Sequence, residues 1–180
     1  PGLEMHTEIS VSPEDDVELR RLKVVNHGGT TRTLEVTTYA EVVLAPSAAD
    51  VAHPAFSKLF IETEFDPGQQ ALLCTRRPRA ATDKSPWLVH LLSAPSAASG
   101  TVTYETDRAR FLGRGGTPAT PAAMEGPLSG TTGAVLDPIV SLRRTITLGP
   151  DESIQLDQVT GVAPDRATAL ALAEKYNQPR

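Results

Sequence analysis

The sequence predicts an all-β protein: an antiparallel β-sandwich followed by a C-terminal linker helix. Three observations predict this fold class. Apolar and polar residues alternate along many short segments, which is the period of a strand with one buried face. Gly, Pro and Asp, which are favoured in turns, separate those segments. One stretch near the C-terminal end instead repeats its apolar residues at helical spacing.

The first half of the chain holds two clear strand patterns. Residues 33–44 carry apolar side chains at even positions and mostly polar ones at odd positions, so one face is expected to be buried. Val17–Val25 is the preceding strand, but its apolar positions change phase across Arg20-Arg21, which predicts a β-bulge there. Asn26-His27-Gly28-Gly29 joins the two strands with residues that tolerate positive φ, as in a hairpin turn.

The same alternation continues through the second half of the chain. Lys58–Phe65 and Ala71–Arg77 are expected to form a hairpin around Asp66-Pro67-Gly68. Four further strands are predicted from the same period, at Trp87–Leu91, Val102–Tyr104, Val140–Leu148 and, after the turn Gly149-Pro150-Asp151, Ser153–Thr160. Strands this numerous, joined by such turns, indicate an antiparallel sandwich.

Three segments depart from the strand pattern. Residues 94–100 are small and polar and predict an exposed connector. Residues 113–133 hold six glycines and three prolines in 21 residues, and so long a loop in a compact domain is expected to be mobile or functional. Pro164–Tyr176 predicts a helix, because Asp165 can cap it and the apolar residues recur at helical spacing. The chain therefore divides into a sandwich, residues 1–163, and the start of a helical linker, residues 164–180.

Composition fits one globular domain and excludes several classes of protein. A chain of 180 residues, 39% of them hydrophobic, is long enough for a sizeable core. The net charge of −5 argues against a nucleic-acid-binding protein. No apolar run approaches the roughly 18 residues of a membrane span, and the first residues do not resemble a signal peptide. The single cysteine, Cys74, excludes an internal disulfide, is expected in the core, and favours a cytoplasmic location.

No catalytic, metal or cofactor site is predicted. The histidines lack metal-ligand spacing and are expected at turns or on the surface; they are His6, His27, His53 and His90. Gly113–Pro118 lacks the Gly-Lys-Ser/Thr ending of a phosphate loop, and Ser129 lacks the Gly-x-Ser-x-Gly context of a nucleophile. Glu62 and Glu64 share one face of a strand, which is expected to be solvated.

The candidate binding residues lie in a charged, glycine-broken loop that is expected directly after the strand ending at Thr106. They are Glu105, Asp107, Arg108, Arg110 and Arg114. A planar guanidinium can hold sugar hydroxyls or a carboxylate with two hydrogen bonds, and the acidic residues are expected to orient the arginines. A salt-bridge network that ties the loop down is the alternative. A second basic cluster, Arg76, Arg77 and Arg79, is interpreted as the solvated guard of an edge strand, with phosphate or glycan contact as the alternative.

Several of these segments carry a resemblance to a known family. The run Tyr104–Gly116, together with Glu41–Pro46, Ala52–Phe60 and Leu136–Ile139, resembles the β-sandwich domain ahead of the catalytic barrel in family 94 glycoside phosphorylases. It is most similar to the phosphorylase-like region of bacterial cyclic β-1,2-glucan synthases, from about Val17 to Tyr176. The resemblance implies a supersandwich related to galactose mutarotase, with residues 164–180 leading to an (α/α)6 barrel outside this chain.

The same resemblance implies a function. Family 94 enzymes cleave β-glucosidic bonds by inverting phosphorolysis, with inorganic phosphate as co-substrate and the catalytic acid in the barrel. This chain is therefore expected to be inactive by itself, to support the barrel and a homodimer, and to place its arginine loop near bound β-glucan. The cytoplasm, or the cytoplasmic part of an inner-membrane protein, is the expected location. Two alternatives remain: an autonomous carbohydrate-binding module, for which one Trp and three Tyr offer few stacking platforms, and a purely structural dimerisation domain.

Overall fold

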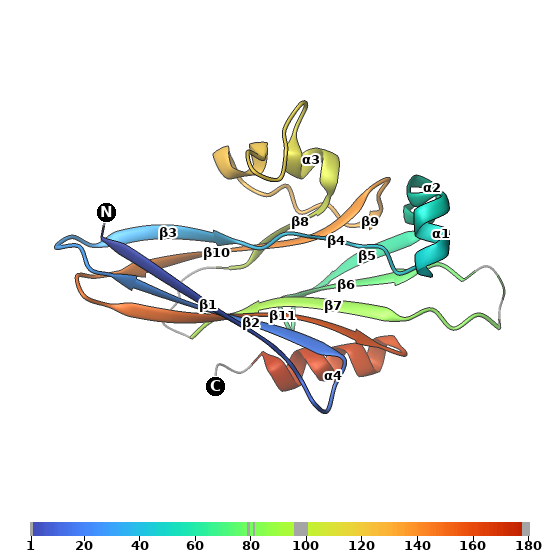
Figure 1. Ribbon diagram of the computed structural model, residues 1–180, viewed down its shortest axis with the longest axis horizontal. Helices are drawn as coiled ribbons and strands as arrows, with labels where there is room; N and C mark the ends of the chain where they lie inside the picture. Colours follow the sequence, from blue (N-terminus) through green and yellow to red (C-terminus); the bar gives the residue numbers. More distant parts are fainter. Residues whose placement is uncertain (1, 79, 81, 96–100, 178–180) are drawn as a thin grey trace.

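The structure, a computed structural model, describes residues 2–78, 80, 82–95 and 101–177 (Figure 1). The elements, in chain order, are β1 Leu3–Val11, β2 Val17–Asn26, β3 Arg32–Thr37, β4 Ala40–Glu41, α1 Ser47–Ala52, α2 Pro54–Lys58, β5 Ile61–Asp66, β6 Ala71–Arg76, β7 Trp87–Ser93, β8 Thr103–Asp107, α3 Arg108–Leu112, the 3-10 helix η1 Ala122–Glu125, β9 Gly133–Ala134, β10 Pro138–Leu148, β11 Ser153–Ala163 and α4 Arg166–Tyr176.

Two antiparallel sheets make up the sandwich, so the predicted fold class is confirmed. The larger sheet has the order β1-β2-β11-β7-β6-β5-β9. In the smaller sheet the long strand β10 pairs with β3 and β4 along one side and with β8 along the other. β3 and β4 share one register against β10, with Thr37 opposite Arg143 and Ala40 opposite Val140. The predicted strand over residues 33–44 is therefore confirmed in β3 and β4, with a short interruption between them, whereas residues 42–44 lie outside any strand.

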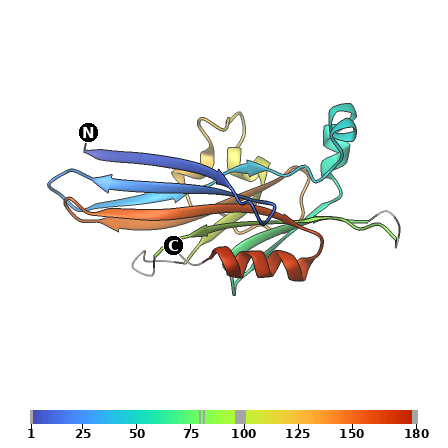
Figure 2. The same cartoon turned by 60° about the horizontal axis from the view of Figure 1, so that its bottom comes forward.

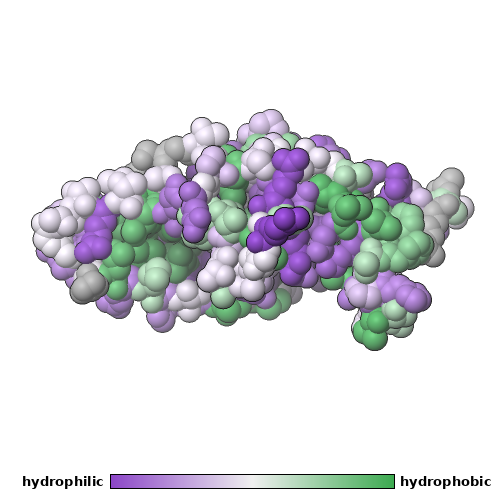
Figure 3. Space-filling view, turned by 90° about the horizontal axis from the view of Figure 1, so that it is seen from above, coloured by the Kyte–Doolittle hydropathy of each residue, from purple (hydrophilic) through white to green (hydrophobic). Residues whose placement is uncertain are grey.

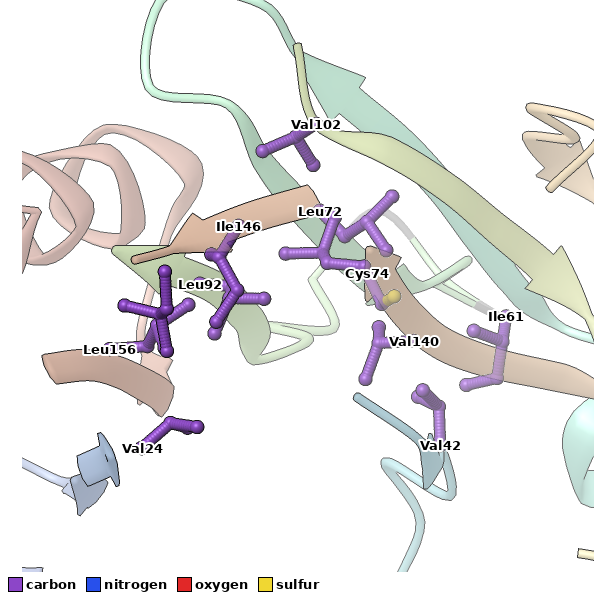
Figure 4. Packing of buried hydrophobic residues seen from close by; sticks show 12 residues of the cluster. Val24, Val42, Ile61, Leu72, Cys74, Leu92, Val102, Val140, Ile146 and Leu156 are labelled. Carbon is purple, nitrogen blue, oxygen red and sulfur yellow. The ribbon is translucent and has the colours of Figure 1, made fainter. Parts of the chain in front are cut away.

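Two apolar clusters hold the layers together. The first lies between the sheets, and Figure 4 shows its side chains converging from both, among them Val24, Leu72, Ile146 and Leu156. The second lies on the opposite face of the larger sheet, where α4 covers it (Figure 2). Ala169, Leu172 and Ala173 are the buried residues of α4. Asp165 accepts a hydrogen bond from the Thr168 N–H at 2.8 Å, which confirms the predicted helix and its cap.

The predicted bulge in β2 is wrong. β2 pairs without a register shift to β1 on one side and to β11 on the other. Its change of phase instead marks a change in the face that is buried. Val17 and Leu19 pack in the cluster under α4, whereas Leu22 and Val24 pack in the cluster between the sheets. A strand covered on different faces at its two ends produces the same sequence pattern as a bulge.

The predicted hairpin between β2 and β3 is also wrong, because these strands lie in different sheets. Neither Gly28 nor Gly29 has a positive φ. Asn26 stabilises the crossing: its buried side-chain amide donates to the carbonyl oxygens of Thr30, Leu148 and Gly149. This amide links the β2–β3 connection to the β10–β11 connection, which also crosses between the sheets.

The structure confirms two further expectations, the β5–β6 hairpin and the core position of Cys74, and contains elements that were not predicted. The β5–β6 hairpin is confirmed, with Glu62 exposed and Thr63 buried, and Cys74 lies fully inside the core. Burial raises the pKa of the Cys74 thiol, so it stays protonated. The edge strand β1 and the helices α1 and α2 were not predicted. Only residues 94 and 95 of the predicted connector are described by the structure, and the rest of that prediction lies outside the described residues.

His90 contradicts the expectation of surface histidines. It lies on β7 with no exposed surface, and its ring nitrogens contact the hydroxyls of Thr38 at 2.8 Å and Thr160 at 2.9 Å. Thr160 belongs to the larger sheet, and Thr38 pairs with the smaller one, so the imidazole bridges the two. Burial lowers the pKa of His90 to about 4, because a charged ring would lose its hydration there.

Candidate functional site

The predicted charged loop begins as a short helix. Figure 1 shows α3 standing over the outer face of the smaller sheet, directly after β8. The Asp107 carboxylate caps it by accepting hydrogen bonds from the N–H groups of Ala109 and Arg110. The helix ends at Gly113, whose φ of +74° favours glycine. A Cβ at Gly116 would clash with the carbonyl oxygen of Leu112. These glycines fold the chain back over α3.

Glu105 is buried beneath this helix, with only 1% of its surface exposed. Its carboxylate accepts hydrogen bonds from the N–H groups of Thr106 and Asp107, at 2.9 and 2.8 Å, and from the hydroxyls of Ser129 and Thr131. Glu105 therefore anchors residues 129–131 to the end of β8. The expectation that it orients the arginines is wrong, because its carboxylate is engaged by these four donors.

Arg108 belongs to a network of ion pairs. Its guanidinium lies 2.9 Å from the Glu41 carboxylate and 3.5 Å from that of Asp137, and Lys58 contacts both carboxylates. The Tyr39 hydroxyl bonds to both Arg108 and Glu41. Partial burial opposes ionisation of Glu41, but this hydroxyl and the two cations outweigh it, so the pKa of Glu41 lies below its usual value. For Arg108, the structure matches the salt-bridge alternative.

Among the described residues, Arg110 and Arg114 do not join this network. The Arg110 side chain is 61% exposed and reaches Asp107 only at 3.8 Å. Arg114 is exposed and, within the described part of the chain, makes no hydrogen bond or ion pair. It lines a shallow pocket of about 450 Å³ together with Gly115, Gly116 and Glu125. Figure 3 looks down on this face and shows hydrophilic side chains, in purple, gathered near its middle.

Residues 113–133, the long loop, are held by a residue that sequence reasoning missed. Arg143 of β10 is 5% exposed and points outward from the smaller sheet into the loop. Its guanidinium donates to the carbonyl oxygens of Gly126 at 2.8 Å and Ala123 at 2.5 Å, and to the Thr37 hydroxyl at 2.8 Å. The loop also contributes Ala123 and Leu128 to an apolar cluster with Phe111, Leu112 and Ile139. The available sequence signal was a β10 pattern apolar on both faces near its start, which implies a covered outer face.

The remaining polar candidates do not join this site. Arg76 donates to the Ser57 carbonyl oxygen and lies over the Phe60 ring, and Arg77 lies 3.9 Å from Glu62. Residue 79 of this cluster lies outside the described residues. Among the residues described, no three His, Cys, Asp or Glu side chains come together in a way that could hold a metal ion. No helix in the described parts of the chain is long and apolar enough to cross a membrane.

Comparison with known proteins agrees with this architecture. Residues 1–179 match the family model described as glycosyl hydrolase 94, supersandwich domain. The chain is also 38% identical over 179 residues to the cyclic beta-(1,2)-glucan synthase NdvB of Rhizobium meliloti (strain 1021). That match covers 98% of this chain but only 6% of the relative's length. This chain belongs to the glycosyl hydrolase 94 supersandwich domain family.

Proposed function

We propose that this chain is a non-catalytic β-sandwich domain of a β-glucan-active glycoside phosphorylase or cyclic β-1,2-glucan synthase. In that protein it supports a catalytic barrel, takes part in a homodimer, and contributes α3 and the long loop to a sugar-binding site. Inorganic phosphate is the co-substrate of the barrel, and the domain itself uses no cofactor. The proposed location is the cytoplasm, free or as part of an inner-membrane protein, which cell fractionation tests.

The observation that carries the sugar-site proposal is the Arg114 guanidinium, which lines the 450 Å³ pocket and has no hydrogen-bond or ion-pair partner among the described residues. The loop that bears it is held from below by two buried side chains, Arg143 and Glu105. A flexible cation on a fixed backbone can reach a ligand without moving the scaffold. Its planar fork can donate two hydrogen bonds to neighbouring sugar hydroxyls and stays charged at any working pH.

The other arginines have different roles in this proposal. Arg108 positions α3 through Glu41 and Asp137, and is a positioning residue. Arg110, more exposed and only loosely paired with Asp107, extends the charged surface beside Arg114. Asp107 shapes the helix, and Glu105 anchors the segment that follows. Of the five candidates, Arg114 and Arg110 are thus the ones that we expect to contact a ligand.

The first test uses the chain alone. Titration with β-1,2-gluco-oligosaccharides should shift the NMR signals of residues 110–125 with a Kd of roughly 1 mM, or about −4 kcal/mol, because the pocket is shallow and few aromatic rings are available. Arg114→Ala should weaken this binding, and Arg77→Ala, at an exposed arginine directly after β6, should leave it unchanged. Micromolar binding would favour the autonomous carbohydrate-binding module. Shifts that avoid the loop would refute the sugar-site assignment.

The second test addresses the missing chemistry. The chain incubated with phosphate and β-1,2-glucan should release no glucose 1-phosphate above a buffer blank, because the catalytic acid of the proposed protein lies in the barrel. In the full-length protein, Arg114→Ala should lower phosphorolysis without changing the melting temperature. Arg108→Ala should lower both, because it removes the contacts of α3 with Glu41 and Asp137. Turnover by the isolated chain would refute the non-catalytic role.

A further inference from the structure

The Trp87 groove, a hollow lined by Glu62, Glu64, Thr75 and Trp87 among others, lies on the outer face of the larger sheet. Glu62 of β5, Thr75 of β6 and Trp87 of β7 are paired in one row across the sheet, and paired residues project from the same face. Trp87 packs against the apolar cluster that α4 covers, so the row lies on the face that carries α4. Figure 2 shows that α4 covers only part of this face.

The sizes of the side chains in this row hollow the surface. Thr75 is small and half-buried, and it lies between the large side chains of Glu62 and Trp87. Neighbouring strands lie about 4.8 Å apart, so the backbones that carry these two walls are about 10 Å apart. The groove has a volume of about 250 Å³, and β9 adds the small residues Gly133 and Ala134 to its lining. Sites for drug-sized ligands measure roughly 300–1,000 Å³, so this groove suits a single small ring.

Trp87 presents an aromatic ring and a free donor to the groove. It is the single tryptophan of the chain and is only partly buried. Its indole N–H makes no hydrogen bond within the described part of the chain and is not among the buried atoms there that lack a partner, so solvent reaches it. The indole N–H can only donate. An aromatic face beside such a donor can contact the C–H groups of a sugar ring and hydrogen-bond one of its oxygens.

The two carboxylates of the groove supply acceptors. Glu62 accepts no hydrogen bond from the described residues, and the Arg77 guanidinium lies 3.9 Å from it. Glu64 accepts from the Arg166 Nε at 2.7 Å through one oxygen, and no described residue bonds the other. An ionised carboxylate has about four lone-pair sites, so both can also accept from sugar hydroxyls. Because each carboxylate has a guanidinium nearby, the local charge is balanced, which favours an uncharged ligand over a cation.

We propose that the Trp87 groove binds one pyranose ring of a saccharide. The ring lies between Trp87 and Glu62, with its C–H face against the indole. Its hydroxyls donate to Glu62 and Glu64, and the indole N–H donates to one of its oxygens. This site is additional to that of the proposed function, because the groove lies on the larger sheet, whereas α3 stands over the smaller one. Only the choice of a β-glucan as the probe rests on the proposed function.

The first experiment uses the single tryptophan as its reporter, because the chain gives one indole N–H signal in NMR and one source of tryptophan fluorescence. Titration with β-1,2-gluco-oligosaccharides should shift the signal and change the emission with a common Kd of roughly 1 mM. Tetramethylammonium, the probe for a cation site, should change neither at equal ionic strength. An indole signal that does not move at about 20 mM oligosaccharide, or one that moves with tetramethylammonium alone, would overturn the proposal.

Variants of the groove test the contacts one at a time. Glu62→Gln keeps the size of an exposed side chain but removes its charge, so it should weaken the Trp87 response about three- to tenfold with an unchanged melting temperature. The matched control is Glu174→Gln, at an exposed glutamate of α4 outside the groove, and it should leave the response unchanged. Trp87→Phe keeps a ring without the N–H and should also weaken binding, measured by the backbone amide signals of residues 62–64. If Glu62→Gln binds like the wild type, or if the control weakens binding equally, the groove assignment is wrong.

The groove and the long loop can be judged separately. Arg114→Ala should leave the indole response unchanged, and Glu62→Gln should leave the shifts of residues 110–125 unchanged. Indole shifts without loop shifts would support the Trp87 groove and count against the sugar site at the loop. Loop shifts without indole shifts would do the reverse.

Discussion

Replacing Arg143 by alanine should loosen the long loop while leaving the sandwich folded. The structure sets the magnitude. Three hydrogen bonds are lost, to the carbonyl oxygens of Gly126 and Ala123 and to the Thr37 hydroxyl, together with the ion pair to the half-exposed Glu35 at 3.3 Å. At roughly 1 kcal/mol each, with a further contribution from the vacated space beside Ala123 and Met124, the free energy of unfolding should fall by about 3–5 kcal/mol. For a domain of this size that is a loss of about 6–20 °C in melting temperature.

The assay combines urea unfolding with hydrogen exchange of the loop amides. Arg143→Ala should lose exchange protection in residues 113–133 first, and protection of β7 and β11 should follow only the global stability. Arg143→Lys, which keeps the charge but not the planar fork, should recover part of the stability. A matched exposed substitution, Arg20→Ala, should stay within about 0.5 kcal/mol of the wild type. If Arg143→Ala costs less than about 1 kcal/mol and loop protection is unchanged, the anchoring role assigned to this guanidinium is wrong.

Three further predictions follow from other buried groups and from one glycine. Glu105→Ala should cost about 2–4 kcal/mol in urea unfolding, because the N–H groups of Thr106 and Asp107 lose their acceptor; a near-neutral result would contradict this. His90 has a folded pKa of about 4 against an ordinary 6.5, so its contribution is complete above pH 6.5 and is lost as the pH falls toward 4, by about 3 kcal/mol. His90→Gln should flatten that part of the stability profile, and an unchanged slope would exclude the histidine as its source. Gly116→Ala should destabilise the loop by about 1–3 kcal/mol through its clash with the Leu112 carbonyl, whereas Gly29→Ala, which has nothing within 4 Å of the added Cβ, should be nearly neutral.

The sequence predicted those strands whose burial follows a period of two, and the capped helix α4. β1 was not predicted, although Leu3, Met5, Ile9 and Val11 alternate with polar residues; it is exposed along its whole length and buries neither face. α1 and α2 were missed because they bury almost nothing: Ser57 is their one buried residue among those described. Short helices without a buried face leave no periodic signal.

The candidate site was predictable as a segment but not as a set of contacts. The charged run after β8 was identified, and its salt-bridge alternative describes Arg108 correctly. The partners of Arg108 could not be predicted, because Glu41 and Asp137 are distant in sequence. They approach Arg108 only through the pairing of β4 and β8 with β10. Arg143 was missed for the same reason. An arginine within a strand is normally solvated, and only the loop folded over it makes it an anchor.

Apart from the Ser129 and Thr131 hydroxyls, which bind Glu105, the polar anchors of the long loop hold it by its backbone carbonyl oxygens. Arg143 binds the carbonyl oxygens of Ala123 and Gly126, Thr106 donates to that of Thr131, and Thr63 donates to that of Gly133. Every amino acid supplies a carbonyl oxygen, so most exposed positions between these points can mutate without releasing the loop. Substitutions can therefore change the chemistry of this surface while the sandwich stays constant. The same property makes residues 117–125 a suitable segment for a combinatorial library.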